Sequence, residues 1–146
     1  MIYYDTAFLA KCYLREPGYK IVRAHAEQVG RIACCEVGKV ELMSVFHRHW
    51  RERRLDVTAF NVVVEQFRAD EAAGVWRWLP ATSALLAAAA RSFEDLAPSV
   101  FLRAADALHL QCVKAAGLAE IFTSDRHLLA ASSFLGVRGR NLLDGP

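Results

Sequence analysis

Two aspartates stand where a short apolar segment gives way to a helical one. Asp5 directly follows residues 2–4, and Asp125 comes just after residues 120–123. In open parallel sheets, ligands bind beyond the carboxyl ends of the strands, often where helices begin with free backbone N–H groups. We therefore expect both carboxylates to project into one crevice, provided that the two strands are neighbours.

Two more acids interrupt apolar helical sequence. Asp106 lies in the segment 103–110, RAADALHL, and Glu41 lies in the run Val-Glu-Leu-Met. A carboxylate is costly to bury unless a cation or hydrogen-bond donors accompany it. Each of these acids therefore needs a partner. Glu36, one turn and one residue earlier, competes with Glu41 for the same role.

The four acids together would suit a hard cation. Carboxylates that are brought together repel one another unless a cation neutralises them, and oxygen ligands favour Mg²⁺ or Mn²⁺. Such ions lower the pKa of bound water and stabilise charge that builds up on a phosphate. This chemistry favours phosphodiester hydrolysis.

A simpler interpretation exists for each acid by itself. Asp5 and Asp125 fit ordinary helix caps, and Asp106 and Glu41 fit solvated helix positions. Spacing and periodicity do not by themselves bring the four together, so both interpretations stay open at this point.

The elements that would position these acids alternate between strands and helices. Such alternation is typical of an α/β fold with a central parallel sheet and helices on both faces. Cap residues, glycines and prolines set most of the boundaries. The predicted strands are 2–4, 31–35, 75–79, 120–123 and 137–142, and the predicted helices are 6–14, 19–29, 37–53, 56–73, 82–96, 103–116 and 125–134.

Composition limits the class of protein. The 146 residues are 54% hydrophobic and carry a net charge of only +2, which fits one globular domain and does not by itself indicate nucleic-acid binding. The four cysteines lack a metal-binding or disulfide-like spacing, so we expect reduced thiols. The N-terminus has no secretory pattern, and the longest apolar run, 84–90, is far shorter than the roughly 20 residues that cross a bilayer. We expect a cytoplasmic protein without a membrane partner.

Four motifs, taken in order, resemble the PIN-domain family, and within it the VapC-type ribonuclease toxins. They are YDTAFL at 4–9, VEL at 40–42, DALHL at 106–110 and FTSDRHLLAA at 122–131. The resemblance spans nearly the whole chain. It implies a PIN-like three-layer domain over residues 1–146.

The resemblance also assembles the acids. It implies that Asp5, Glu41, Asp106 and Asp125 surround Mg²⁺ or Mn²⁺ and that metal-activated water cleaves RNA internally. It further implies a homodimer and an antitoxin protein whose C-terminal segment lies across the active-site groove. The chain would then be the toxin of a type II toxin–antitoxin pair.

Other polar residues could assist this site. The family often has a serine where this chain has Ala7, which affects an outer contact only. Thr6 and Thr123 remain available to orient a carboxylate. Arg126 is expected either to hold a phosphate or to be simply exposed. His109 and His127 follow Asp106 and Asp125 closely, but structural roles are favoured for both.

The basic residues Arg48, Arg51, Arg53 and Arg54 gather where the helix 37–53 ends. They could contact RNA phosphates, although cations also favour the carboxyl end of a helix, and a solvated face has the same composition.

Two other functions compete with the ribonuclease. A phosphatase with an aspartyl nucleophile after the first strand wants a second Asp two residues later, where Ala7 stands. A non-catalytic PIN-fold module that binds RNA or a protein would keep the fold but bind divalent metal poorly, so metal titration distinguishes it.

Overall fold

The structure, a computed structural model, describes residues 1–144 as alternating strands and helices. The strands are β1 Ile2–Tyr3, β2 Ile32–Cys35, β3 Trp76–Leu79, β4 Glu120–Phe122 and β5 Arg138–Arg140. The helices are α1 Thr6–Tyr13, α2 Tyr19–Val29, α3 Val37–Arg51, α4 Val57–Ala72, α5 Ser83–Arg91, α6 Ala104–Ala115 and α7 Arg126–Ser132, followed by a 3₁₀ turn at Ser133–Leu135.

All strands run parallel in the order β3-β2-β1-β4-β5. Strand β2 lies between β1 and β3, and β4 pairs with β5. A single bridge between Tyr4 and Phe122 joins the two groups of strands. The carboxyl ends of β1 and β4 therefore lie side by side at the centre of the sheet, as the sequence analysis required.

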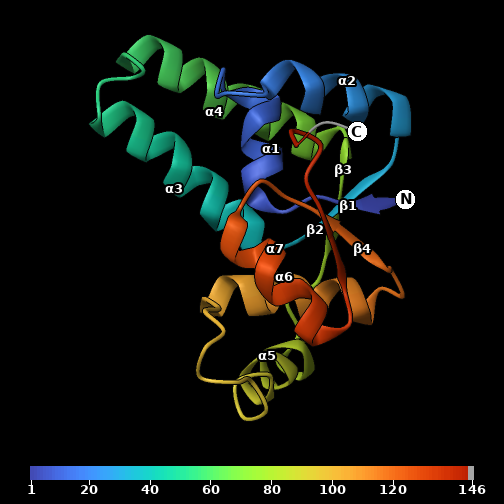
Figure 1. Ribbon diagram of the computed structural model, residues 1–146. Helices are drawn as coiled ribbons and strands as arrows, with labels where there is room; N and C mark the ends of the chain where they lie inside the picture. Colours follow the sequence, from blue (N-terminus) through green and yellow to red (C-terminus); the bar gives the residue numbers. More distant parts are fainter. Residues whose placement is uncertain (145–146) are drawn as a thin grey trace.

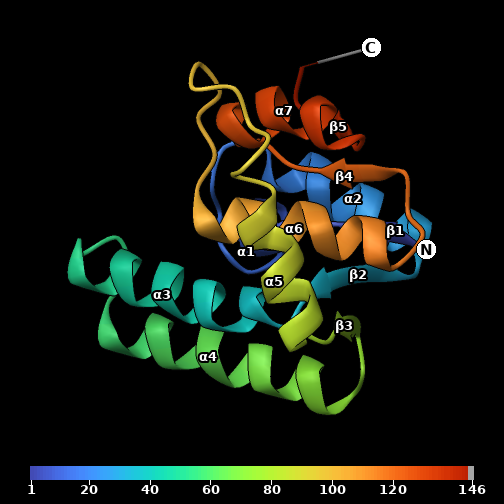
Figure 2. The same cartoon turned by 90° about the horizontal axis from the view of Figure 1, so that it is seen from below.

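Helices cover both faces of the sheet, which confirms the predicted α/β three-layer architecture. Because strand residues alternate between faces, Tyr3 and Tyr4 enter different cores. Tyr3 packs with α5, α6 and α7, and Tyr4 packs with α1 to α4. Figures 1 and 2 show these two groups on opposite sides of the strands, with α3 and α4 forming a hairpin that projects from the body.

The predicted elements occur, with one clear difference of length. The helix expected over 82–96 ends at Arg91. The Ser92 hydroxyl donates a hydrogen bond to the carbonyl of Ala88 at 3.1 Å. Such a bond from a side chain to the backbone competes with the hydrogen bonds that would continue the helix. Glu94 and Asp95 would also place negative charge at the negative end of the helix dipole. These residues therefore form turns that lead into the connection to α6.

Candidate active site

Asp5 is the most deeply buried of the four acids. It caps α1, where its Oδ1 accepts a hydrogen bond from the Phe8 backbone N–H at 3.0 Å. Its Oδ2 accepts from the Thr123 hydroxyl at 2.5 Å. The residue is 4% exposed, and no basic side chain within residues 1–144 forms an ion pair with it. Burial raises the pKa of Asp5 to about 6, although the Thr123 bond opposes the rise.

Thr123 joins Asp5 to the second strand-end acid. Its side-chain oxygen also accepts from the backbone N–H of Asp125 at 2.9 Å, so one buried hydroxyl contacts both residues. Asp125 caps α7 by accepting from the backbone N–H groups of His127 at 2.8 Å and Leu128 at 3.3 Å. The strand pairing of β1 with β4 thus brings the two caps together.

Asp106 enters the same cluster from the first turn of α6. Its carboxylate accepts from the backbone N–H of Arg103 at 3.2 Å, and the Arg103 guanidinium donates to Asp125 at 2.8 Å. Burial raises the pKa of Asp106, and the negative charge of Asp125 raises it further, while Arg103 opposes the rise. Arg103 therefore connects two acids that repel each other.

Glu41, in the second turn of α3, lies where α1 and α6 meet. Its Oε2 accepts from the Thr6 hydroxyl at 2.6 Å and is 2.7 Å from Nε2 of His109. His109 is buried, and its other ring nitrogen lies 2.7 Å from the hydroxyl of Tyr3. Burial alone would raise the pKa of Glu41, but the hydrogen bonds and charge of His109, together with Thr6, bring it below its usual value.

We call Asp5, Glu41, Asp106 and Asp125, with their partners Thr6, Arg103, His109 and Thr123, the acid site. Arg103 and His109 engage two of the four carboxylates, Asp125 and Glu41. Within residues 1–144, no three Asp, Glu, His or Cys side chains stand in an arrangement that could hold a metal ion.

A family model and a solved structure match this chain. The family model for the PIN domain matches residues 2–133. The chain belongs to the PIN-domain family. None of the curated proteins compared with it matches. Among solved structures, it is similar to Mycobacterium tuberculosis VapC20, a sarcin–ricin-loop-cleaving toxin, with a TM-score of 0.70 and 17% identity over 90% of this chain and 95% of the other.

The remaining candidates lie in different parts of this PIN domain. Glu36 is exposed and accepts from the backbone N–H of Ala81 at 3.3 Å, away from the acid site. Arg126 is exposed in the first position of α7. Sequence reasoning used Arg103 only as a helix boundary. The signal that could have found it is a basic residue at the cap of α6, where Ser, Thr, Asp or Asn is usual.

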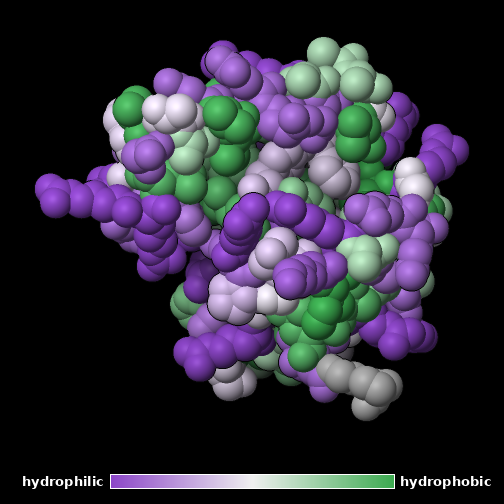
Figure 3. Space-filling view, turned by 90° about the horizontal axis from the view of Figure 1, so that it is seen from above, coloured by the Kyte–Doolittle hydropathy of each residue, from purple (hydrophilic) through white to green (hydrophobic). Residues whose placement is uncertain are grey.

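The basic cluster occupies the tip of the α3–α4 hairpin. Arg48, Arg51, Arg53 and Arg54 are all exposed there. In Figure 3 this end of the molecule, at the left, carries projecting hydrophilic side chains with hydrophobic ones beside them. Arg51 comes ten residues after Glu41 on the same helix, which corresponds to roughly 15 Å along its axis. Arg51 and the residues that follow it are therefore too far along α3 to contact Glu41 directly.

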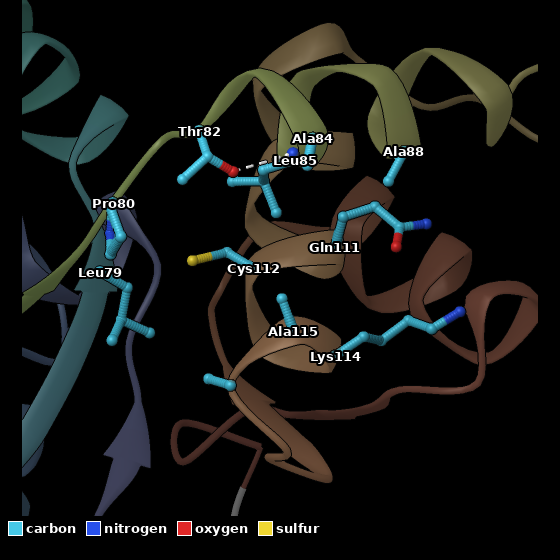
Figure 4. A pocket seen from close by; sticks show the side chains of 11 residues that line it. Leu79, Pro80, Thr82, Ala84, Leu85, Ala88, Gln111, Cys112, Lys114 and Ala115 are labelled. Carbon is cyan, nitrogen blue, oxygen red and sulfur yellow. Dashed lines mark hydrogen bonds between the residues drawn. The ribbon is translucent and has the colours of Figure 1, made fainter.

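The PIN domain also contains an apolar pocket, between α5 and α6. It measures about 510 Å³, and Figure 4 shows Leu85 and Cys112 among its lining residues. No acidic side chain lines it. The pocket is thus separate from the acid site.

No helix in the part of the chain that the structure describes combines the length and apolar character needed to cross a membrane.

Proposed function

We propose that this PIN domain is a metal-dependent endoribonuclease, the toxin of a type II toxin–antitoxin pair. The observation that carries the proposal is the Asp5 carboxylate, which is buried without a basic partner and joined through Thr123 to Asp125. Burial of this carboxylate still outweighs its hydrogen bonds from Phe8 and Thr123, because the pKa of Asp5 is raised, so the ionised form costs free energy unless a ligand compensates it. A divalent cation is the ligand that oxygen donors of this kind select.

The carboxylates of the acid site are oxygen donors of the kind that Mg²⁺ or Mn²⁺ selects, and they would have to move closer together to hold the ion, because no three are arranged for a metal in the described residues. Asp5, Asp106 and Asp125 would hold the ion, and Glu41 would hold it or align the attacking water. The side chain of Arg103 is 53% exposed, so it can leave Asp125 when a cation arrives. A bound ion would supply a water of lowered pKa and would stabilise negative charge on the phosphate.

Residues of the chain prepare the carboxylates for this role. Thr123 restrains Asp5, and Thr6 and His109 both bind Oε2 of Glu41. The other oxygen of Glu41 stays available for water or a ligand, because a carboxylate can accept about four hydrogen bonds. Fixing each acid before substrate binds lowers the cost of ordering the site during the reaction.

The biological role rests on relatives. The similar fold of VapC20 belongs to a toxin that cleaves the sarcin–ricin loop, and the sequence motifs are those of VapC-type toxins. An antitoxin partner, a homodimeric state and a cytoplasmic location are the corresponding expectations for this chain. A short neighbouring reading frame for a DNA-binding antitoxin would support the assignment.

Cleavage of RNA by the purified protein tests the proposal. We expect internal cuts with Mg²⁺ or Mn²⁺, no cuts with EDTA, and recovery when the ion is restored in excess. The variant Asp106→Asn should fold and fail to cut. Cleavage that continues in EDTA would refute the metal requirement. RNA binding without cleavage, together with no heat of Mn²⁺ binding in calorimetry, would favour the non-catalytic module instead.

A further inference from the structure

The connection that leads into α6 presents an aromatic and a basic side chain beside the acid site. Phe101 is 55% exposed, Leu102 is buried, and Arg103 is exposed. Arg103 has extended backbone dihedral angles, in which successive side chains point to opposite sides. Leu102 therefore anchors the segment in the core, while Phe101 and Arg103 face solvent.

A third side chain completes this surface from α7. The rings of Phe101 and His127 lie 4.6 Å apart at an angle of 59°, and the Arg103 guanidinium carbon lies 5.7 Å from the centre of the Phe101 ring. Figure 2 shows the connection between α5 and α6 passing near α7, as the pairing of these two rings requires. We call Phe101, Arg103 and His127 the aromatic rim.

The aromatic rim adjoins the acid site directly. Arg103 donates to the carboxylate of Asp125, and the backbone N–H of His127 donates to the same carboxylate. A ligand that reached Asp125 from solvent would therefore meet the rim. Because more than half of Phe101 is exposed, it contributes little to the core. Exposing an apolar ring to water is also unfavourable, so packing alone does not explain this residue.

Other exposed phenylalanines lack these neighbours. Phe93 and Phe134 are 44% and 62% exposed, and within residues 1–144 neither has an aromatic ring or a cation packed on it. Single exposed apolar residues of that kind are ordinary. Phe101 differs because an imidazole and a guanidinium both lie near its ring, and each of these two residues also donates to Asp125, while more than half of Phe101 stays exposed.

This combination suits a single-stranded nucleic acid. Proteins that bind single strands place aromatic side chains under the bases and cations along the backbone, and a π-face accepts any base. We propose that the aromatic rim is a nucleotide subsite: one base of single-stranded RNA stacks on Phe101, and Arg103 and His127 contact the adjoining phosphate. The proposal deepens the ribonuclease function above and rests on it.

Three consequences follow from this subsite. Once a cation has displaced the Arg103 guanidinium from Asp125, a phosphate of the arriving RNA would give that guanidinium a new partner. The subsite would also set where the RNA is cut, because it fixes one base relative to Asp125 and Asp106. It would favour unpaired RNA, since a base inside a duplex cannot stack on a side chain.

A change in the protein, combined with a change in the RNA, tests the subsite. The probes are single-stranded oligoribonucleotides that contain a cut site mapped with the unaltered protein, each with one abasic nucleotide at a different position. Stacking on an aromatic residue corresponds to roughly a 5- to 150-fold effect per base. We expect Phe101→Ala to lower kcat/KM for the intact RNA within that range, with KM carrying most of the change.

One abasic position near the cut should reproduce this loss in the unaltered protein and cause no further loss in Phe101→Ala. Phe101→Trp should keep the activity, because it keeps a π-face. Phe134→Ala is the matched control and should cut like the unaltered protein. Thermal unfolding of each variant verifies that it folds.

The outcomes separate this inference from the function on which it rests. If the unaltered protein cuts no RNA, the ribonuclease proposal fails and the subsite fails with it. If it cuts RNA and Phe101→Ala cuts equally well, only the subsite is refuted, and a protein partner becomes the better explanation of the exposed ring. A loss in Phe101→Ala that adds to the abasic loss at every position would also refute stacking.

Discussion

Asp5 and Asp56 cap their helices in almost the same way, yet only one belongs to the acid site. Their dihedral angles are φ −77°, ψ 177° and φ −79°, ψ 174°, and each accepts from a backbone N–H three residues later. Asp56 is exposed on the α3–α4 hairpin, whereas Asp5 is buried at the end of a central strand against Thr123. Local sequence produces the cap, and the topology of the sheet decides which cap becomes a site.

The largest expected effect is on RNA cleavage, and it distinguishes the helix cap Asp125 from the helix cap Asp56. Asn caps a helix about as well as Asp but carries no charge. Asp125→Asn should therefore fold and lose RNA cleavage by more than about 100-fold, beyond the loss typical of residues that only support a metal ligand. Asp56→Asn should cut at the rate of the unaltered protein. Equal activity of the two variants would remove Asp125 from the site.

The second expected effect is on the free energy of unfolding, and it distinguishes Asp5 from Asp56. The pKa of Asp5 is about 6 in the folded chain, above the value near 3.9 of an unfolded one, so the unfolded state binds fewer protons between these values. The ionised carboxylate thus destabilises the fold as pH rises from about 4 to 6. Without divalent ions, Asp5→Asn should raise the free energy of unfolding at pH 8 by up to about 3 kcal/mol, the equivalent of a two-unit shift.

Urea unfolding at several pH values measures this difference. The gain from Asp5→Asn should vanish near pH 4, and Asp56→Asn should stay within about 0.5 kcal/mol of the unaltered protein throughout. Mg²⁺ should stabilise the unaltered protein more than Asp5→Asn, because binding to the folded state alone shifts the equilibrium. A destabilised Asp5→Asn at pH 8 would contradict the burial cost inferred for this carboxylate.

The elements and their order could be predicted because their signals are local. Alternating apolar segments, the cap candidates Asp5, Asp56 and Thr82 or Ser83, and the helix-ending Gly30 and Gly117 all act within a few residues. The main error, in the length of α5, arose where Ala-rich periodicity was continued through Ser92 into acidic residues. Local signals also revealed that Asp106 interrupts an apolar helix face.

The contacts of the acid site could not be derived in that way. The contacts that bring separate elements together join residues distant in sequence: Thr123 to Asp5 across the sheet, and Thr6 and His109 to Glu41 across two helices. Only the family resemblance brought the acids together before the structure did. Phe101 was not identified at all, because exposure and neighbours, which no sequence pattern displays, are what distinguish it from other phenylalanines.

The third expected effect distinguishes the hydroxyl of Thr123 from that of Thr82. Thr123 contacts Asp5 and Asp125, whereas Thr82 is the exposed cap of α5 and accepts from Leu85 at 3.1 Å. Thr123→Val should lower RNA cleavage by about 10- to 100-fold, as loss of a residue that orients a ligand does. Thr82→Val should leave cleavage unchanged and cost about 1 kcal/mol of stability. A Thr123→Val variant that cuts normally would show that Asp5 needs no such restraint.

The smallest effect lies in the turn that precedes Asp56. Arg53 has a φ of 58°, and its N–H bonds the carbonyl of Trp50 while that of Arg54 bonds His49, the pattern of a helix end that favours glycine. Arg53→Gly should relieve the strain and stabilise the fold by about 0.5–1 kcal/mol in urea unfolding, once the entropy of glycine is deducted. Arg51→Gly, two residues earlier at the end of α3, should instead lower stability. If Arg53→Gly also weakens RNA cleavage, this arginine contacts the substrate despite its distance along α3, and the hairpin is part of the RNA-binding surface after all.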